Sequence, residues 1–202
     1  FYLASDAVKS ADDRLLTGIR SVPALDPGAG ASGTTTVTIP ASTPLGSYFV
    51  LACADDKGTV VESNEDDNCA ATSGAVVTVG QPDLVEGQVS NPPATKKRGT
   101  TFSVGDTAQN LGNVAAKASK TRYYLSTDAT KSSGDKLLSG ARAVPALAPG
   151  AAHTVIKSVK IPAATVPGSY YVLACADDTK TSAETSESNN CAASSSKITV
   201  TQ

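Results

Sequence analysis

The sequence predicts an all-β protein made of tandem immunoglobulin-like or fibronectin-III-like β-sandwich modules, the first of which lacks its opening strands. Three observations carry this prediction: a self-repeat, short strand-like runs divided by turn residues, and two equally spaced cysteine pairs. The stretch SYFVLACADD at 47–56 returns as SYYVLACADD at 169–178, 122 residues further on. Self-similarity at a fixed offset indicates an array of similar modules.

The repeat divides the chain into a module at 1–80, a linker at 81–82 and a module at 83–202. Phe1 corresponds to Tyr123, in the interior of the second module, so the first module is expected to lack two strands. A half-sandwich leaves apolar residues and a sheet edge uncovered. We expect either about forty further residues ahead of Phe1 in the native polypeptide or strands donated by a neighbouring copy.

Short β-rich runs alternate with turns rich in Pro, Gly and Asn, the pattern of a sandwich. No apolar stripe of helical period extends over a useful length. The strands expected in the second module are 83–89, 99–110, 114–126, 137–144, 154–161, 169–177 and 190–200. Those expected in the first module are 1–5, 15–22, 34–39, 47–55 and 69–79.

Alternation along the strands assigns side chains to the two faces of each sheet. It places Tyr2, Tyr124 and the cysteines on the outer face, so replacing Tyr170 by alanine should destabilise far more than replacing Tyr124. Lys157 falls on the inward parity, and a bulge or a strand end near solvent would resolve that conflict. The other inward residues include Tyr48, Val50, Ala52, Tyr170, Val172 and Ala174.

Four cysteines permit three disulfide pairings. Module symmetry favours Cys53–Cys69 and Cys175–Cys191, each closing a loop that contributes roughly 3 kcal/mol in the chain-entropy model. Neither pair has the C-x-x-C spacing of a zinc site, and the single histidine lies elsewhere. Because disulfides persist in oxidising compartments, the protein is predicted to be exported.

Charge and hydropathy exclude several classes of partner. A net charge of −2 gives no basic footprint for nucleic acid, and no apolar run is long enough to span a membrane. The one basic run, at 96–98, is interpreted as a solvated turn beside Pro92, Pro93 and Gly99.

Catalytic and cofactor sites are not predicted. The sequence at 28–33 fits G-x-G-x-x-G, but it precedes a strand rather than a helix, and the second copy loses it. His153 corresponds to Ala31 and has no partner constellation, so an exposed strand residue is expected.

Acidic loops are the remaining candidates for a ligand site. Carboxylates between the paired cysteines could supply oxygens to Ca²⁺, although Asp and Asn also stabilise turns. The calcium candidates are Asp55, Asp56 and Glu62 in the first copy and Asp177, Asp178 and Glu184 in the second. A weaker candidate is the loop with Asp6, Asp12 and Asp13, repeated as Asp128 and Asp135. Glycan binding is poorly supported, because the chain has no Trp and few exposed aromatic candidates.

The motifs PDLVEGQVSNPP, NLGN, RYYLSTD, PALAPG, PGSYYVLACADD and ESNN together resemble the bacterial cell-adhesion-related domain family, CARDB. The resemblance covers the whole chain. It implies an immunoglobulin-like sandwich in a secreted or surface protein of bacteria. The resemblance implies little about mechanism. Because no catalytic site recurs in both copies, we expect a structural or adhesive role, with other modules, neighbouring copies or an unknown surface ligand as partners. The alternative is a calcium-dependent or glycan-binding extracellular module.

Overall fold

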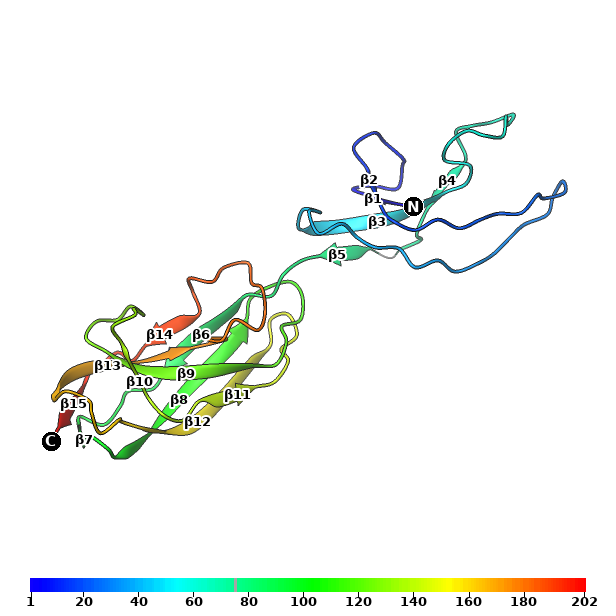
Figure 1. The fold of residues 1–202 in the computed structure, drawn as a ribbon. Coiled ribbons are helices and arrows are strands. Elements are labelled where there is room, and N and C mark those ends of the chain that lie inside the picture. Colours follow the sequence, from blue (N-terminus) through cyan, green and yellow to red (C-terminus); the bar gives the residue numbers. More distant parts are fainter. Residues whose placement is uncertain (75) are drawn as a thin grey trace. The chain divides into compact units, whose positions relative to one another are not determined.

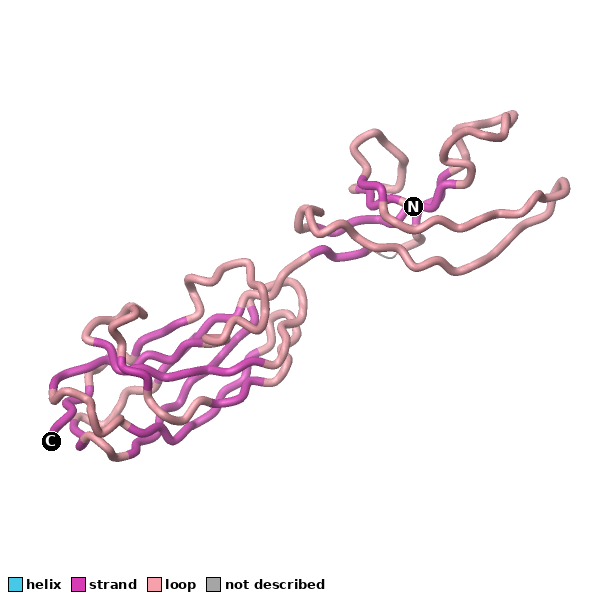
Figure 2. Tube along the Cα trace, viewed as in Figure 1, coloured by secondary structure: helices cyan, strands magenta, loops and turns pink. Residues whose placement is uncertain are grey.

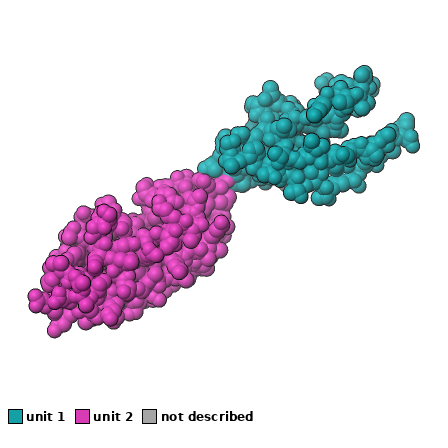
Figure 3. Space-filling model, viewed as in Figure 1, with its two compact units in different colours: residues 1–79 teal, residues 80–202 magenta. Residues whose placement is uncertain are grey.

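The computed structural model describes residues 1–74 and 76–202, which form strands, turns and loops without any helix (Figures 1 and 2). The described part of the chain therefore offers no helix long and apolar enough to cross a membrane. The chain divides into two compact units, unit 1 (Phe1–Val79) and unit 2 (Gly80–Gln202), which Figure 3 colours separately.

Unit 2 is a sandwich of two sheets. The smaller sheet has the order β12-β8-β6, from Ala152–Lys160, Thr101–Asn110 and Leu84–Val89. The larger sheet has the order β10-β9-β13-β15-β7, with β11 attached to β9 and β14 attached to β13. Its strands are β7 (Thr95–Lys97), β9 (Ser119–Ser126), β10 (Lys136–Leu137), β11 (Arg142–Val144), β13 (Gly168–Cys175), β14 (Cys191–Ala193) and β15 (Ile198–Thr201).

The core of unit 2 lies between these sheets. Apolar residues at alternate positions of β8 and β12 meet those of β9, β13 and β15, as the strand period of two requires. The buried members are Phe102, Val104, Tyr123, Leu125, Leu138, Val159, Ile161, Val172, Ala174, Ile198 and Val200. A second cluster at one end joins β6 to the loop residues Ala116 and Leu147.

The strand expected at 137–144 is interrupted, because its middle crosses to the other sheet. β10 and β11 both pair with β9, whereas Ser139 between them bridges to Lys160 at the end of β12. Gly140 adopts a φ of 119° there, and a Cβ on it would lie 2.6 Å from the Ser158 carbonyl oxygen. Only glycine fits this close approach. The strand expected at 190–200 likewise forms as two, β14 and β15.

Two local interpretations need correction. The basic run 96–98 is a solvated turn only at Arg98, because Lys96 and Lys97 belong to β7, which pairs in parallel with β15. Lys157 sits within an unbroken ladder opposite Val104, so neither a bulge nor a strand end explains its inward parity. The register shift in this sheet lies instead in β6, between Glu86 and Gln88.

Unit 1 has one five-stranded sheet, ordered β2-β1-β3-β4 with β5 also paired to β3. Its strands are β1 (Tyr2–Ala4), β2 (Arg14–Leu15), β3 (Gly46–Cys53), β4 (Cys69–Ala71) and β5 (Val77–Val79). The strands expected at 15–22 and 34–39 are reduced to β2 and one bridge, Thr17 to Thr38. In unit 2 the counterpart of 34–39 is part of β12, which pairs with β8 along its whole length. Among residues 1–74 and 76–79 no strand is equivalent to β8, so the segment 34–39 has no ladder to join.

The face assignment holds in unit 2, where Val172 and Ala174 are fully buried in the core. In unit 1 the equivalent Val50 is half-buried and Ala52 is exposed, because one sheet alone cannot cover them. Tyr124 does point away from the core, yet it is only 8% exposed. The low cost expected for truncating Tyr124 assumed an exposed ring, and that assumption is contradicted, because a loop covers the outer face.

Candidate functional site

Both units carry a disulfide on the outer face of a central strand, β3 in unit 1 and β13 in unit 2. We call this disulfide, together with the tyrosine, lysine and aspartate beside it, the staple. A disulfide joins Cys175 of β13 to Cys191 of β14, and another joins Cys53 of β3 to Cys69 of β4. The paired cysteines are direct cross-strand neighbours in both ladders, with Cα atoms 4.0 Å apart. The local β pairing thus brings the sulfur atoms together.

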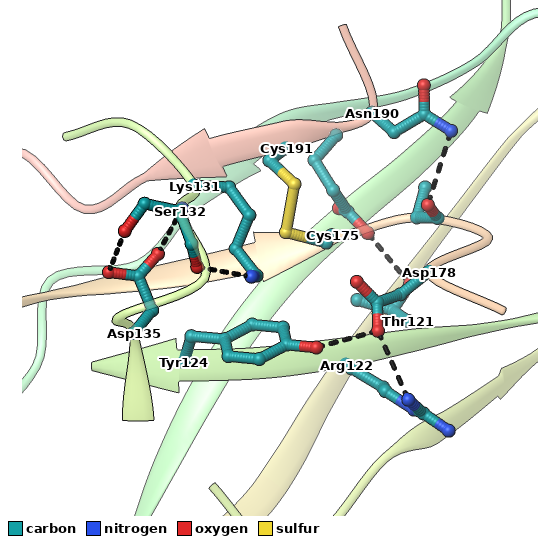
Figure 4. Close-up of a disulfide and its surroundings, with 12 residues drawn as sticks. Thr121, Arg122, Tyr124, Lys131, Ser132, Asp135, Cys175, Asp178, Asn190 and Cys191 are labelled. Atoms are coloured by element: carbon teal, nitrogen blue, oxygen red, sulfur yellow. Dashed lines mark hydrogen bonds and ion pairs between the residues drawn. A yellow bond between two sulfur atoms is a disulfide. The ribbon is translucent and has the colours of Figure 1, made fainter. Parts of the chain in front are cut away.

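A tyrosine beside the disulfide ties the hairpin to a loop (Figure 4). In unit 2 the Tyr124 hydroxyl donates to Asp178 at 2.7 Å, and the Lys131 ammonium lies 4.1 Å from the ring centroid. Burial, followed by the bond to Asp178, raises the pKa of Tyr124 to about 12. The same contacts recur in unit 1, where Tyr2 donates to Asp56 at 2.7 Å and lies 4.1 Å from the Lys9 ammonium.

The loop over the tyrosine is also the same in both units. The Lys131 ammonium donates to the Ser132 carbonyl at 2.8 Å, and the Asp135 carboxylate accepts from the Ser132 N–H at 2.6 Å (Figure 4). In unit 1 Asp13 accepts from the Ser10 N–H at 2.7 Å. These carboxylates, the weaker calcium candidates, stabilise their own turn.

Two calcium candidates, Asp55 after β3 and Asp177 after β13, cap the turn that follows each strand. Asp55 accepts from the Val60 N–H at 2.6 Å and the Thr59 hydroxyl at 2.5 Å, with a φ of 38°. These bonds lower the pKa of Asp55, the Thr59 bond most. Asp177 accepts equivalent bonds from Thr181 and from the Ser182 N–H, with a φ of 39°. Both carboxylates are therefore engaged by N–H and O–H donors of their own loops.

The two glutamates among the candidates differ. Glu184 is buried and accepts from the Leu84 N–H at 3.2 Å and from the Asn190 amide at 2.8 Å. Burial raises its pKa to about 7. Glu62, its counterpart, is exposed. Within residues 1–74 and 76–202, no three acidic, His or Cys side chains are grouped so that they could hold a metal ion.

The staple predicts a measurable contribution to stability. Replacing both Cys175 and Cys191 by alanine should lower the free energy of unfolding of unit 2 by about 3 kcal/mol, through loss of the closed loop. Denaturant titration of the variant against the oxidised parent measures this change. Non-reducing peptide mapping that found a link between Cys53 and Cys175 would contradict the pairing itself.

A buried ionic cluster, which the sequence analysis missed, lies inside unit 2. Arg142 of β11 donates from Nε to the Asp106 carboxylate of β8 at 2.5 Å and pairs with it again through Nη2. Glu86 of β6 lies 4.0 Å from Nη2, and its side chain is fully buried. The Tyr123 hydroxyl donates to the other Asp106 oxygen. The cluster therefore ties both sheets together by charge.

Neighbouring groups complete the cluster. The Thr121 hydroxyl donates to Glu86 Oε1 at 2.7 Å, while Oε2 has no partner among the described residues. Burial, and then the nearby Asp106, raise the pKa of Glu86 to about 8. His153 is not simply an exposed strand residue, since its Nδ1 accepts from the Arg142 guanidinium at 2.9 Å. Arg142 corresponds to Arg20 in the repeat, and this repeated arginine is the signal in the sequence that could have pointed to the cluster.

The sandwich and its staple define a class: small disulfide-stapled β modules of the immunoglobulin-like kind. The model of the CARDB family matches residues 4–72 and 81–194, and the chain belongs to that family. No curated protein matches it.

Three solved structures illustrate what the chain is similar to. A CARDB domain from Pyrococcus furiosus, solved in complex with di-metal ions, is 21% identical with a TM-score of 0.43, over 61% of this chain and 97% of that one. A domain of a predicted cell surface protein from Methanosarcina acetivorans is 18% identical with a TM-score of 0.42, over 60% and 94%. A beta-glucosidase from Listeria innocua is 19% identical with a TM-score of 0.37, over 63% of this chain and 17% of that one.

Proposed function

We propose that the chain is a non-catalytic structural or adhesive part of an exported bacterial surface protein or extracellular fibre. The observation that carries the proposal is the staple. The interactions that the two units share all hold a hairpin and its loops together. They are a disulfide, a lysine ammonium over a tyrosine ring and a hydrogen bond from that tyrosine to an aspartate. Disulfides of this kind suit an oxidising exterior, and the family membership agrees with that location.

Surface location is tested with antibodies raised against the chain and applied to intact cells of the source organism. Labelling of unbroken cells, lost after mild surface proteolysis, is the expected result. Labelling that appears only after lysis would contradict an exported role.

The adhesive part of the proposal includes strand donation between copies. A sheet with an uncovered face and unpaired edge groups accepts strands from a partner by β-augmentation. Sedimentation of the 202-residue chain over a range of concentrations should therefore show self-association. A chain that stays monomeric at hundreds of micromolar would exclude donation between copies while leaving the structural role intact.

Calcium is not required in this proposal, because the candidate carboxylates serve their own turns. We expect the melting temperature of the chain to be the same in 2 mM Ca²⁺ and in excess EDTA, on the order of a degree or less apart. Differential scanning calorimetry of both samples makes the comparison. A chelation-dependent fall of several degrees would favour the calcium-dependent alternative instead.

A further inference from the structure

The chain enters and leaves unit 2 at opposite ends of the sandwich. β6 begins beside the end of β8, since Leu84 pairs with Asn110. β7 lies at the other end, because only three residues separate Lys97 from the start of β8 at Thr101. β15 runs parallel to β7 and ends beside it, with Thr201 opposite Lys97. Tension along the chain therefore pulls the start of β6 and the end of β15 in opposite directions (Figure 1).

β7 and β15 form a parallel contact that such tension loads along the strands. The Thr199 N–H donates to the Ala94 carbonyl at 2.8 Å at the start of the pair. The Arg98 N–H donates to the Thr201 carbonyl at 3.0 Å at its end. Pulling β7 by its start and β15 by its end slides the strands past each other, so the evenly spaced bonds of the parallel ladder carry the force together. Pulling both strands from the same end would break those bonds one after another.

The segment that leads into β6 is fastened to unit 2 before the strand begins. The Gln81 N–H donates to Asn113 Oδ1 at 3.1 Å, and the Asp83 N–H donates to Asn110 Oδ1 at 3.0 Å. The Asp83 carbonyl in turn accepts from the Leu111 N–H at 2.7 Å. These bonds and the β6–β8 ladder take the tension first. If they yield, the tension passes along the chain to β7, and the β7–β15 pair is the contact that still joins the two loaded ends.

We propose that unit 2 resists tension along the chain, and that the parallel β7–β15 pair is the contact that sets this resistance. The inference rests on the proposed function, because a structural part of a surface protein or fibre is pulled when its attachments move. Resistance to force is a matter of rate, since forced unfolding is governed by the unfolding rate and not by equilibrium stability. A contact whose bonds must break together raises the barrier that controls this rate.

The test compares two directions of pulling on the oxidised 202-residue chain in an optical trap. The described residues include no free cysteine, so added cysteines are the thiols available for attachment. One form carries them ahead of Phe1 and behind Gln202; the other carries Lys97→Cys and a cysteine behind Gln202. Lys97 is exposed and lies beside Thr201, so the second form peels the pair apart from one end. The force that unfolds unit 2, identified by the length of chain released, should be at least about twofold higher from end to end.

A proline at position 98 removes one bond of the pair while suiting the turn beside it. Arg98 and Gly99 are the central residues of a turn in which the Thr100 N–H donates to the Lys97 carbonyl at 3.3 Å. Gly99 has a φ of 80°, as at the second central position of a type II turn, where proline is common at the first. Proline has no N–H to donate to Thr201. Arg98→Pro should therefore lower the end-to-end force by roughly a quarter, as one bond of a short parallel ladder is lost.

Arg98→Ala is the matched control, because it removes the same side chain but keeps the N–H; it should leave the end-to-end force unchanged. Equal forces in the two pulling directions, or equal forces for Arg98→Pro and Arg98→Ala, would overturn the inference. If Arg98→Pro does not fold, the comparison of pulling directions decides the matter alone. Neither result depends on where the protein is located, so labelling of intact cells remains a separate test of the proposed function.

Discussion

Replacing Arg142 with alanine is expected to lower the free energy of unfolding of unit 2 by about 3–5 kcal/mol. The substitution leaves the Asp106 carboxylate buried between the sheets without its cation, and it removes the donor that holds the His153 ring. Peptide-resolved hydrogen exchange under native conditions measures the change in unit 2 alone. The loss should appear in β8, β9 and β13 together, because the cluster joins both sheets.

The chain supplies its own matched control. Arg20 occupies the equivalent position in unit 1 but forms no ion pair with any residue that the structure describes, so Arg20→Ala should change stability by less than about 0.5 kcal/mol. A second variant, Asp106→Asn, should destabilise unit 2 as well, because Arg142 then loses its closest carboxylate and keeps only the more distant Glu86. Equal, small effects of Arg142→Ala and Arg20→Ala would show that the buried cluster contributes little.

The stability of unit 2 is expected to fall as the pH rises from about 4.5 to about 8. Burial raises the pKa of Glu86 to about 8, above its ordinary value, so the folded protein keeps a proton that the unfolded chain has released. The folded state therefore binds more protons in this window, and stability declines with pH by up to about 1.4 kcal/mol per unit for one group. The stabilisation from protonated Glu86 is fully present below the pKa that this residue has in the unfolded chain, about 4.5, and is lost as the pH rises to about 8.

Neutral isosteres identify the groups responsible. Glu86→Gln should flatten the decline toward pH 8, and Glu184→Gln should remove a component that ends near pH 7, where burial places the pKa of Glu184. Urea titrations at several pH values give the slopes. Asp106, Arg142, Tyr123 and Thr121 face Glu86 and remain in place in these variants. A rise of stability with pH over this window, or an unchanged slope in Glu86→Gln, would contradict the assignment.

Local patterns in the sequence predicted much of this molecule. Turn residues and alternation located most strands of unit 2, because hydrophobic alternation is a property of the strand itself. The repeat also predicted the disulfide pairing that the structure contains, between Cys53 and Cys69 and between Cys175 and Cys191. The family followed from the same motifs.

Other features depended on what lies across the fold. Nothing local distinguishes Thr95–Lys97 as a strand until β15 is beside it. Tyr124 points away from the core, yet a loop and the disulfide bury it, which alternation cannot register. The segment 34–39 has the composition of a strand but lacks the partner that β8 gives to β12.

By itself, the sequence determined the all-β class, the repeat and the staple, since these depend on spacing along the chain. Only the tertiary structure decided that Glu86, Asp106 and Arg142 meet, because they come from strands far apart in the sequence and show no charge pattern there. The surroundings of the calcium candidates likewise depend on the folded loops and not on the sequence pattern. The sequence could not show which donors surround a carboxylate, and in the structure Asp55 and Asp177 accept hydrogen bonds from N–H and hydroxyl groups of their own loops.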